Sequence, residues 1–260
     1  MKDTNWNPPS SPWLAPLAEP CETRPVSWTA PDPGHHVVAI QAAPRPRGDS
    51  LPRTVASLGR WDGPSLIVAD GCRPEIPGWK VDASDRQEGS SSNLLRLLHG
   101  VATGWPGFTR LILLQDDVIL ALNALEYMSR MVIPEDVGWV AMFAEMWTGR
   151  GVGWPRLGIY GRHQRFYDSQ CVVMPRATVL DLLDCHGAWP WNRIHGCDLM
   201  FNRLGKSFAV HVPNLAEHME GLNSACEHES LGERRSPNFP GPGFDALSLI
   251  GGDHAGMPVP

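Results

Sequence analysis

Apolar residues in this chain gather in short continuous runs, and stretches with helical spacing lie between them. The runs at 35–41, 65–71 and 109–115 are rich in valine, isoleucine and leucine, which is typical of buried strands. Residues 49–61 place apolar side chains three and four positions apart, and residues 90–102 predict a helix with a serine N-cap. Strands that alternate with helices predict an α/β fold, with a mostly parallel central sheet flanked by helices.

The alternation continues with less regularity in the second half of the chain. Residues 138–144 predict a strand, and residues 170–186 predict a strand followed by a helix with Pro175 near its first turn. A helix that ends at Gly205 and then a last strand and a turn are predicted between 196 and 218.

The predicted domain boundaries follow from two segments outside this pattern. Residues 1–34 contain eight prolines and predict an extended, Pro-rich N-terminal arm. Residues 35–225 form the predicted α/β domain, and residues 226–260 are an irregular C-terminal tail. Within the domain, the glycine-rich residues 149–161, which include Trp154, have the composition of a mobile lid.

Composition and charge limit the partners and the cellular compartment that we expect for the protein. The 260 residues carry a formal charge of -6, which gives no global attraction to nucleic acid or an anionic membrane, although a local basic groove is compatible with it. No apolar run reaches about 18 residues, and the first residues lack the apolar core of a secretory signal. The six cysteines form no C-x-x-C pair. We expect a cytoplasmic protein with reduced thiols and no membrane partner.

The run LILLQDDVIL, residues 111–120, sends two adjacent carboxylates out of an apolar strand. Asp116 and Asp117 repel each other, and a buried carboxylate is costly unless it is paired or binds a metal. Asp70 ends the preceding apolar run in the same way. Ligands bind where the carboxyl ends of parallel strands meet, so these aspartates are expected to share one crevice. A plain turn at the strand end is the alternative.

Two later residues are candidates for the same crevice. His218 follows a predicted strand, and imidazole is a ligand for Mn²⁺ and related metals, with a structural histidine as the alternative. Asp198 stands at the start of an amphipathic helix, where a general base and a helix cap are both reasonable interpretations. A zinc-type cluster of His218 with His211, Glu217 and His228 also stays open, although no H-E-x-x-H pattern is present.

Arg45 and Arg47 follow the first predicted strand, with prolines on both sides of Arg45. A guanidinium fork matches phosphate oxygens, so an anionic group is the expected partner and solvated surface charge the alternative. The chain has neither a G-x-x-x-x-G-K-[ST] nor a G-x-G-x-x-G element, which argues against P-loop and dinucleotide-binding folds.

Taken in order, four segments between about His36 and Ser224 resemble the GT-A fold glycosyltransferases, which use nucleotide-sugar donors. Their order and spacing carry the resemblance, because each short motif also occurs by chance. The third segment resembles the D-x-D metal motif of that family. The segments are VVAIQAAPRPRGDSLPRTVASL, LIVADG, LILLQDDV and GCDLMFNRLGKSFAVHVPNLAEHMEGLNS.

The resemblance implies a metal site and a base. Asp117 would bind a divalent metal, Mn²⁺ or Mg²⁺, and His218 would bind the metal or the diphosphate. Asp198 would take the proton from the acceptor hydroxyl, which implies inversion at the anomeric carbon. The enzyme that the resemblance implies is a glycosyltransferase of the hexosyltransferase type.

The resemblance also implies a set of donor contacts, with a UDP-sugar as the expected donor. Arg45 would lie on the phosphate side, Asp70 would meet the nucleoside, and Asp116 would contact the nucleotide or the sugar. Gln115 departs from the acidic residue of many relatives, and its amide is expected to hydrogen-bond the ribose.

The acceptor stays open at this point. A hydroxyl on a glycan or a small molecule is the broad expectation. A hydroxymethylated DNA base, as in phage enzymes that act in the host cytoplasm, is one alternative, with Trp147 and Trp154 beside an extruded base. A non-catalytic nucleotide-sugar binding module is another. The basic groups expected to follow a DNA backbone are Arg45, Arg47, Arg53, Arg162, His163, Arg165, Arg234 and Arg235.

Overall fold

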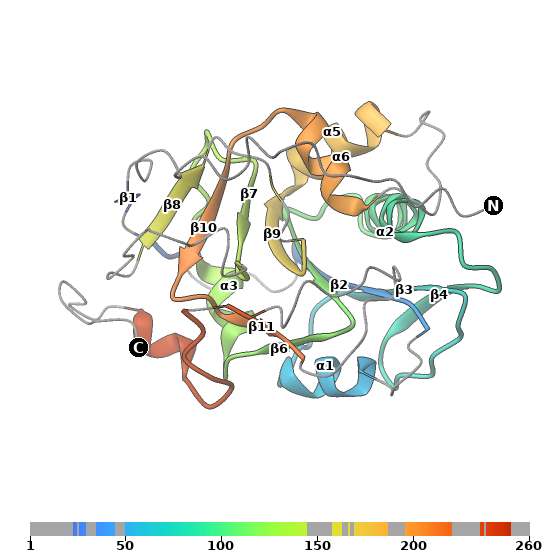
Figure 1. Cartoon of the computed structure of the whole chain (residues 1–260), viewed down its shortest axis with the longest axis horizontal. Helices are drawn as coiled ribbons and strands as arrows, with labels where there is room; N and C mark the ends of the chain where they lie inside the picture. Colours follow the sequence, from blue (N-terminus) through green and yellow to red (C-terminus); the bar gives the residue numbers. More distant parts are fainter. Residues whose placement is uncertain are drawn as a thin grey trace, which may run out of the picture.

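The structure is a computed structural model. It describes residues 23–24, 26–29, 35–44, 50–144, 158–162, 166, 169–186, 196–219, 235–236 and 238–250. These residues build a nine-stranded sheet with helices on both faces and a separate two-stranded sheet (Figure 1). The predicted α/β class, with a central sheet flanked by helices, is therefore confirmed. None of the helices in these ranges is long and apolar enough to cross a membrane.

One half of the large sheet is entirely parallel and contains the first three predicted strands. These strands are buried over almost their whole length, as expected when helices or loops cover both faces of a sheet. The sequence pattern does not predict β4, because this edge strand is only half-buried and has no apolar run. The order is β5 (Arg110–Gln115), β2 (His36–Ala42), β3 (Ser65–Asp70) and β4 (Lys80–Ser84).

The other half of the sheet is mixed, because β9 (Cys171–Pro175) lies antiparallel between β5 and β7 (Trp139–Ala141). β10 (Phe208–Val212) runs parallel to β7. β8 (Gly158–Arg162) and β1 (Thr23–Arg24) complete this side in antiparallel pairs. The carboxyl ends of β5, β7 and β10 therefore meet at one edge of the sheet, and β9 begins at that edge.

Part of the predicted lid is a strand instead. Residues 158–161 belong to β8, which pairs with β10 in antiparallel register from Gly158 to Arg162. Glycine content alone suggested mobility, but pairing with an existing strand fixes the backbone of these residues. Residues 149–157 of the predicted lid lie outside the described ranges.

Two apolar cores lie on the two faces of the sheet. The helices that cover them are drawn on either side of the sheet in Figure 1. β5 feeds both, since Leu111 points into one core and Ile112 into the other. The first core is covered by α2 (Ser90–Gly104), α5 (Arg176–His186) and α6 (Cys197–Leu204). The second is covered by α1 (Leu51–Ser57), α3 (Ala124–Arg130) and the small sheet of β6 (Val118–Leu120) and β11 (Ala216–His218).

The predicted serine N-cap of α2 is wrong. Ser90 is the first helical residue, and the N-cap is Gly89 at a φ of 103°. A residue with a Cβ is strained at this φ, so a glycine suits the turn that leads into the helix.

Pieces of both predicted terminal regions pack against the domain. The N–H of Thr29 donates to the carbonyl of Arg130 at 2.7 Å, and Trp28 forms a bridge with Met131. At the other end, a 3₁₀ helix that the sequence pattern does not predict, η3 (Ala246–Leu249), buries its first and last residues in the core. The described parts of these regions are therefore integral to the packing.

His211 is a core residue of β10. Its Nε2 lies 2.7 Å from the hydroxyl of Tyr127, and its Nδ1 lies 2.6 Å from the carbonyl oxygen of Pro213. Burial lowers the pKa of His211 to about 4, against a small opposing effect of the Pro213 carbonyl. The imidazole is therefore neutral at pH 7 and serves the core.

His211 should make the stability of the protein fall with acid. Its folded pKa lies below its ordinary value of about 6.5, so its contribution is complete above pH 6.5 and is lost as pH falls toward 4. The loss amounts to about 3 kcal/mol of unfolding free energy. Urea unfolding between pH 7.5 and 4.5 measures it, and His211→Gln, which does not titrate, should show a shallower decline. Parallel declines in the two proteins would show that His211 does not titrate with folding.

Candidate active site

The acidic pair lies in the turn between β5 and β6, at the carboxyl edge of the sheet. The backbone fixes this turn, because the N–H of Asp116 donates to the carbonyl of Gln41 at 3.1 Å. The hydroxyl of Thr54 donates to the Asp116 carbonyl at 2.8 Å. Both aspartates are almost completely buried. The pair does lie in a turn at the strand end, as the alternative from the sequence had it, but this turn is buried.

Strand pairing brings His218 to Asp117. His218 lies opposite Val118 in the β6–β11 pair, and the N–H of Met219 donates to the carbonyl of Asp117 at 2.8 Å. In this register the Nε2 of His218 is 2.9 Å from the Oδ2 of Asp117. The two side chains are only 10% and 3% exposed, so this contact is shielded from water.

This donor pair fits a divalent cation. Carboxylate oxygen and imidazole nitrogen both bind Mn²⁺. The 2.9 Å between Asp117 Oδ2 and His218 Nε2 is the length of a direct N–H···O hydrogen bond. Two ligands at right angles, each about 2.1 Å from an octahedral ion, would lie about 3.0 Å apart, so an ion could replace this proton with little movement of either side chain. Among the described residues, no group of three or more His, Cys, Asp or Glu side chains is placed to hold an ion. Substrate oxygens or water would have to complete the coordination.

Asp116 faces the end of β2. Its Oδ2 accepts a hydrogen bond from the N–H of Ala43 at 3.1 Å. Arg45 and Arg47, the predicted phosphate contacts two and four positions further along, lie outside the described residues. Asp116 thus ties the acidic turn to the segment that leads to these arginines.

A polar cluster, with Ser169 and Cys197 buried and Gln115 half-buried, links the acidic turn to α6. The amide nitrogen of Gln115 donates to the hydroxyl of Ser169 at 3.2 Å and approaches the sulfur of Cys197 at 3.8 Å. The Ser169 oxygen and the Cys197 sulfur are 3.0 Å apart. Cys197 opens α6, so the cluster fixes the first turn of that helix beside β5. Asp198 is the second residue of α6 and half-buried, and the N-cap is Gly196.

Asp70 shares the same edge but holds the backbone. Its Oδ1 accepts from the N–H of Glu88 at 2.8 Å, and its Oδ2 accepts from the N–H of Gly89 at 2.9 Å. Both carboxylate oxygens thereby fix the turn that starts α2. Its contact with a nucleoside stays a prediction.

The zinc-type cluster considered from the sequence does not form around His211. Both ring nitrogens of His211 are engaged by Tyr127 and Pro213, which leaves no lone pair directed at a metal. His228 lies outside the described residues. The structure therefore brings His218 to Asp117 and leaves His211 in the core.

Sequence reasoning missed two residues around the site, Ser169 and Cys197, and it considered Glu217 only for the zinc-type cluster. Glu217 accepts from the N–H groups of His218 and Ser236. Burial raises the pKa of Glu217, while these hydrogen bonds oppose the shift. The alternation of β11 gave a signal for Glu217, because neighbours in a strand point to opposite sides. Nothing local signalled Ser169 or Cys197.

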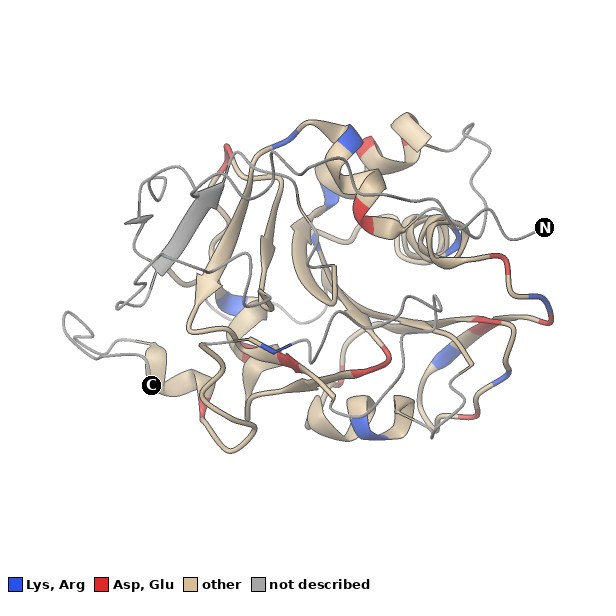
Figure 2. Ribbon diagram, in the orientation of Figure 1, with Lys and Arg blue, Asp and Glu red and all other residues tan. Residues whose placement is uncertain are grey.

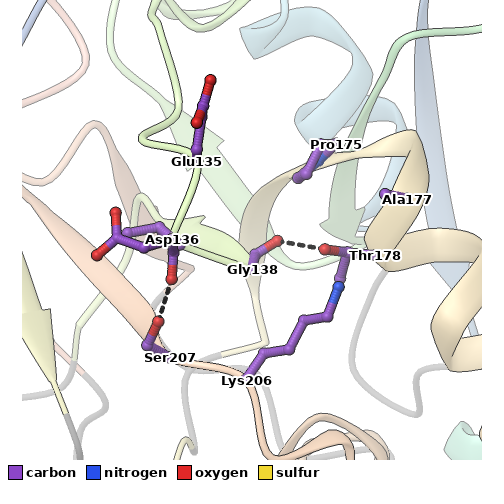
Figure 3. A pocket seen from close by; sticks show the side chains of 9 residues that line it. Glu135, Asp136, Gly138, Pro175, Ala177, Thr178, Lys206 and Ser207 are labelled. Atoms are coloured by element: carbon purple, nitrogen blue, oxygen red, sulfur yellow. Dashed lines mark hydrogen bonds between the residues drawn. The ribbon is translucent and has the colours of Figure 1, made fainter.

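A separate pocket lies at the opposite edge of the sheet (Figure 3). It measures about 240 Å³ and sits where β7 and β10 begin and β9 ends. The hydroxyl of Thr178 donates to the carbonyl of Gly138 at 2.7 Å, and Lys206 pairs with Asp181. None of the predicted site residues lines it. The lining residues are Glu135, Asp136, Val137, Gly138, Pro175, Ala177, Thr178, Lys206 and Ser207.

Replacing Asp70 by Asn should destabilise the fold. The substitution turns one of two acceptors into an amide donor that faces a backbone N–H, at a cost of about 1–3 kcal/mol in unfolding free energy. Urea unfolding measures the loss. Asp62→Asn is the matched control, because Asp62 is exposed and its carboxylate pairs with the exposed Arg60, so a change within about 0.5 kcal/mol is expected. Equal stability of Asp70→Asn and wild type would contradict this role.

No protein-family model and no curated protein matches the chain. Some solved structures are similar to part of the chain, at low sequence identity. A mannose-1-phosphate geranyltransferase from Thermus thermophilus is 14% identical, with 68% of this chain and 73% of that chain covered and a TM-score of 0.44. The protein A197 from STIV is 13% identical, with 70% and 85% covered and a TM-score of 0.44. A Drosophila beta-1,4-galactosyltransferase 7 in complex with manganese, UDP-Gal and xylobiose is 11% identical, with 70% of each chain covered and a TM-score of 0.37.

Proposed function

We propose that this chain is a metal-dependent glycosyltransferase of the GT-A type, which moves a sugar from a nucleotide-sugar donor to an acceptor hydroxyl. The observation that carries the proposal is the shielded 2.9 Å contact between Asp117 and His218. It lies at the carboxyl edge of an α/β sheet, where ligands bind in this class of fold. Both partners belong to segments that carry the family resemblance: Asp117 lies in the motif QDDV, and His218 lies in the last of the four segments.

Asp117 and His218 would hold the metal, with Mn²⁺ or Mg²⁺ as the candidates. A bound divalent cation offsets the charge that develops on a diphosphate leaving group. The protein supplies the position for it: the backbone bonds of the β5–β6 turn fix Asp117, and pairing with β6 fixes His218. Since both side chains are already in place, little ordering is needed on binding.

Asp198 is the proposed general base. As the acceptor oxygen bonds to the anomeric carbon, the bond from that carbon to the diphosphate breaks, and the acceptor proton passes to the Asp198 carboxylate. The products are the glycosylated acceptor and the nucleoside diphosphate. A base on the face opposite the leaving group gives inversion at the anomeric carbon. The cluster of Gln115, Ser169 and Cys197 supports this role, because it anchors the first turn of α6 next to the acidic turn.

The donor is proposed to be a UDP-sugar. Asp116 accepts a hydrogen bond from Ala43, just after β2 and two residues before Arg45. This position favours a contact between Asp116 and the nucleotide. Gln115 directs its amide nitrogen to Ser169 and Cys197, so only its carbonyl oxygen is proposed to meet the ribose.

The acceptor is proposed to be a hydroxyl on a glycan or a small molecule. A basic track for DNA would need clustered cations, but basic and acidic positions are interspersed over the described elements (Figure 2). Of the basic groups considered from the sequence, only Arg53 and Arg235 have described side chains. Trp147 and Trp154 lie outside the described residues. Duplex DNA binding that weakens steeply across a salt series would restore the DNA alternative.

A metal-dependent donor complex should be visible as a thermal shift. Ligands that bind only the folded state raise its stability by about 2.7 kcal/mol at 100 times their Kd, or about 5–10 °C for a chain of this size. Nucleoside diphosphates and nucleotide sugars are tested with and without Mn²⁺. We expect a shift with one nucleotide, and only when Mn²⁺ is present.

The same shift should vanish in Asp117→Asn and His218→Ala, while the exposed control Asp62→Asn keeps it. A shift of equal size without Mn²⁺ would contradict the metal site. If no nucleotide shifts the folded wild type, the glycosyltransferase proposal fails.

Asp198→Asn should lose transfer and keep the donor. Removal of a general base typically slows a reaction by about 10²–10⁴-fold, while Mn²⁺ and donor affinity should stay unchanged. Product formation is followed by chromatography, with Asp184→Asn as the control, since Asp184 is an exposed aspartate of α5. Unchanged transfer would remove Asp198 from the mechanism. Donor binding without transfer or hydrolysis in the wild type would favour a non-catalytic binding module.

A further inference from the structure

A segment near the end of the chain straps the small sheet. The C-terminal strap, residues 235–236 and 238–250, forms backbone hydrogen bonds with Leu122, two residues after the end of β6. The N–H of Leu122 donates to the carbonyl of Pro242 at 3.1 Å, and the N–H of Ala246 donates to the carbonyl of Leu122 at 2.9 Å. The strap is thus hydrogen-bonded to the chain that leaves the small sheet.

A carboxylate connects the strap to the other strand, β11. Both oxygens of Glu217 lie 3.1 Å from the N–H of Ser236, and its Oε1 also accepts from the N–H of His218 at 2.9 Å. The hydroxyl of Ser236 donates to the side-chain oxygen of Asn214. Ser236 is buried, and its bond to Asn214 is shielded from solvent, while Glu217 is half-buried. Glu217 is therefore the link between the strap and the strand that carries His218.

The small sheet needs such support. β6 and β11 have three residues each, and a two-stranded sheet of this length is marginal without further packing. Yet it sets the distance between Asp117 and His218. Successive residues of a strand point to opposite sides, so Glu217 holds the strap on one side while His218 faces Asp117 on the other.

We propose that Glu217 is a positioning residue for the metal site. By binding Ser236 of the strap it fixes β11, and thereby keeps His218 Nε2 at ligand distance from Asp117. This inference rests on the proposed function, because it concerns the same metal. Mutating a group that orients a metal ligand without touching the ion commonly weakens metal binding by about 10–100-fold.

Calorimetric titration of the full chain with Mn²⁺ tests the proposal. Glu217→Ala is expected to weaken Mn²⁺ binding by about 10-fold or more, and Glu217→Gln, which keeps one acceptor oxygen, should show an intermediate loss. Glu126→Ala is the matched control, because Glu126 is a half-exposed glutamate of α3 whose carboxylate pairs with Arg130. Its Mn²⁺ affinity should equal that of the wild type. Circular dichroism verifies that each variant is folded.

The outcomes separate this inference from the proposed function. Mn²⁺ affinity in folded Glu217→Ala equal to that of the wild type overturns the positioning role and leaves the metal site intact. If Glu217→Ala does not fold, Glu217→Gln carries the test, and unchanged affinity there overturns the role. A folded wild type that binds no Mn²⁺ overturns the metal site and this inference together.

Discussion

The pairing of β6 with β11 is the contact on which the candidate site depends. It joins residues 118–120 to residues 216–218, nearly a hundred positions apart in the chain. Through it a buried carboxylate meets an imidazole at 2.9 Å. Asp117 is almost completely buried, and burying a charged carboxylate away from an imidazole partner costs free energy of folding. A few backbone hydrogen bonds therefore determine whether the buried Asp117 carboxylate has the His218 imidazole beside it.

The larger sheet gives this small pairing a fixed base. Parallel strands deliver their ends to one edge, and the antiparallel β9 starts at that edge with Ser169 and Gln170 just before it. The result is a polar cluster beneath α6 in an otherwise apolar layer. Buried polar groups that satisfy one another hold a defined arrangement, because any displacement leaves a donor or acceptor without a partner. We interpret the cluster as the element that relates α6 to the acidic turn.

The sequence predicts a strand when the apolar pattern is contained in the strand itself, and fails when the strand depends on a distant partner. The strands around Ile40, Val68 and Leu113 are continuous apolar runs, and their burial needs no knowledge of the rest of the chain. β4, β6 and β11 are short or half-exposed, so they become strands only because a partner is already there.

The candidate site divides in the same way. Asp117 and His218 could be paired in advance only through a family resemblance, since their contact depends on strand register. Asp70 looked like a ligand contact, but the N–H groups that it accepts from lie 18 and 19 residues further along the chain. The link from Glu217 to Ser236 is equally non-local.

The central position of β5 has a consequence for how the chain is made. Once residue 115 has been synthesised, the parallel half of the sheet is complete, but the free edge of β5 waits for β9. Translation from residue 115 to residue 175, the end of β9, takes about 3–12 s at ordinary rates. During that time a strand with apolar side chains on both faces is available to other nascent chains, which is a known route to aggregation. The protein therefore passes through a vulnerable half-built sheet, and its metal-binding histidine candidate arrives among the last parts to be added.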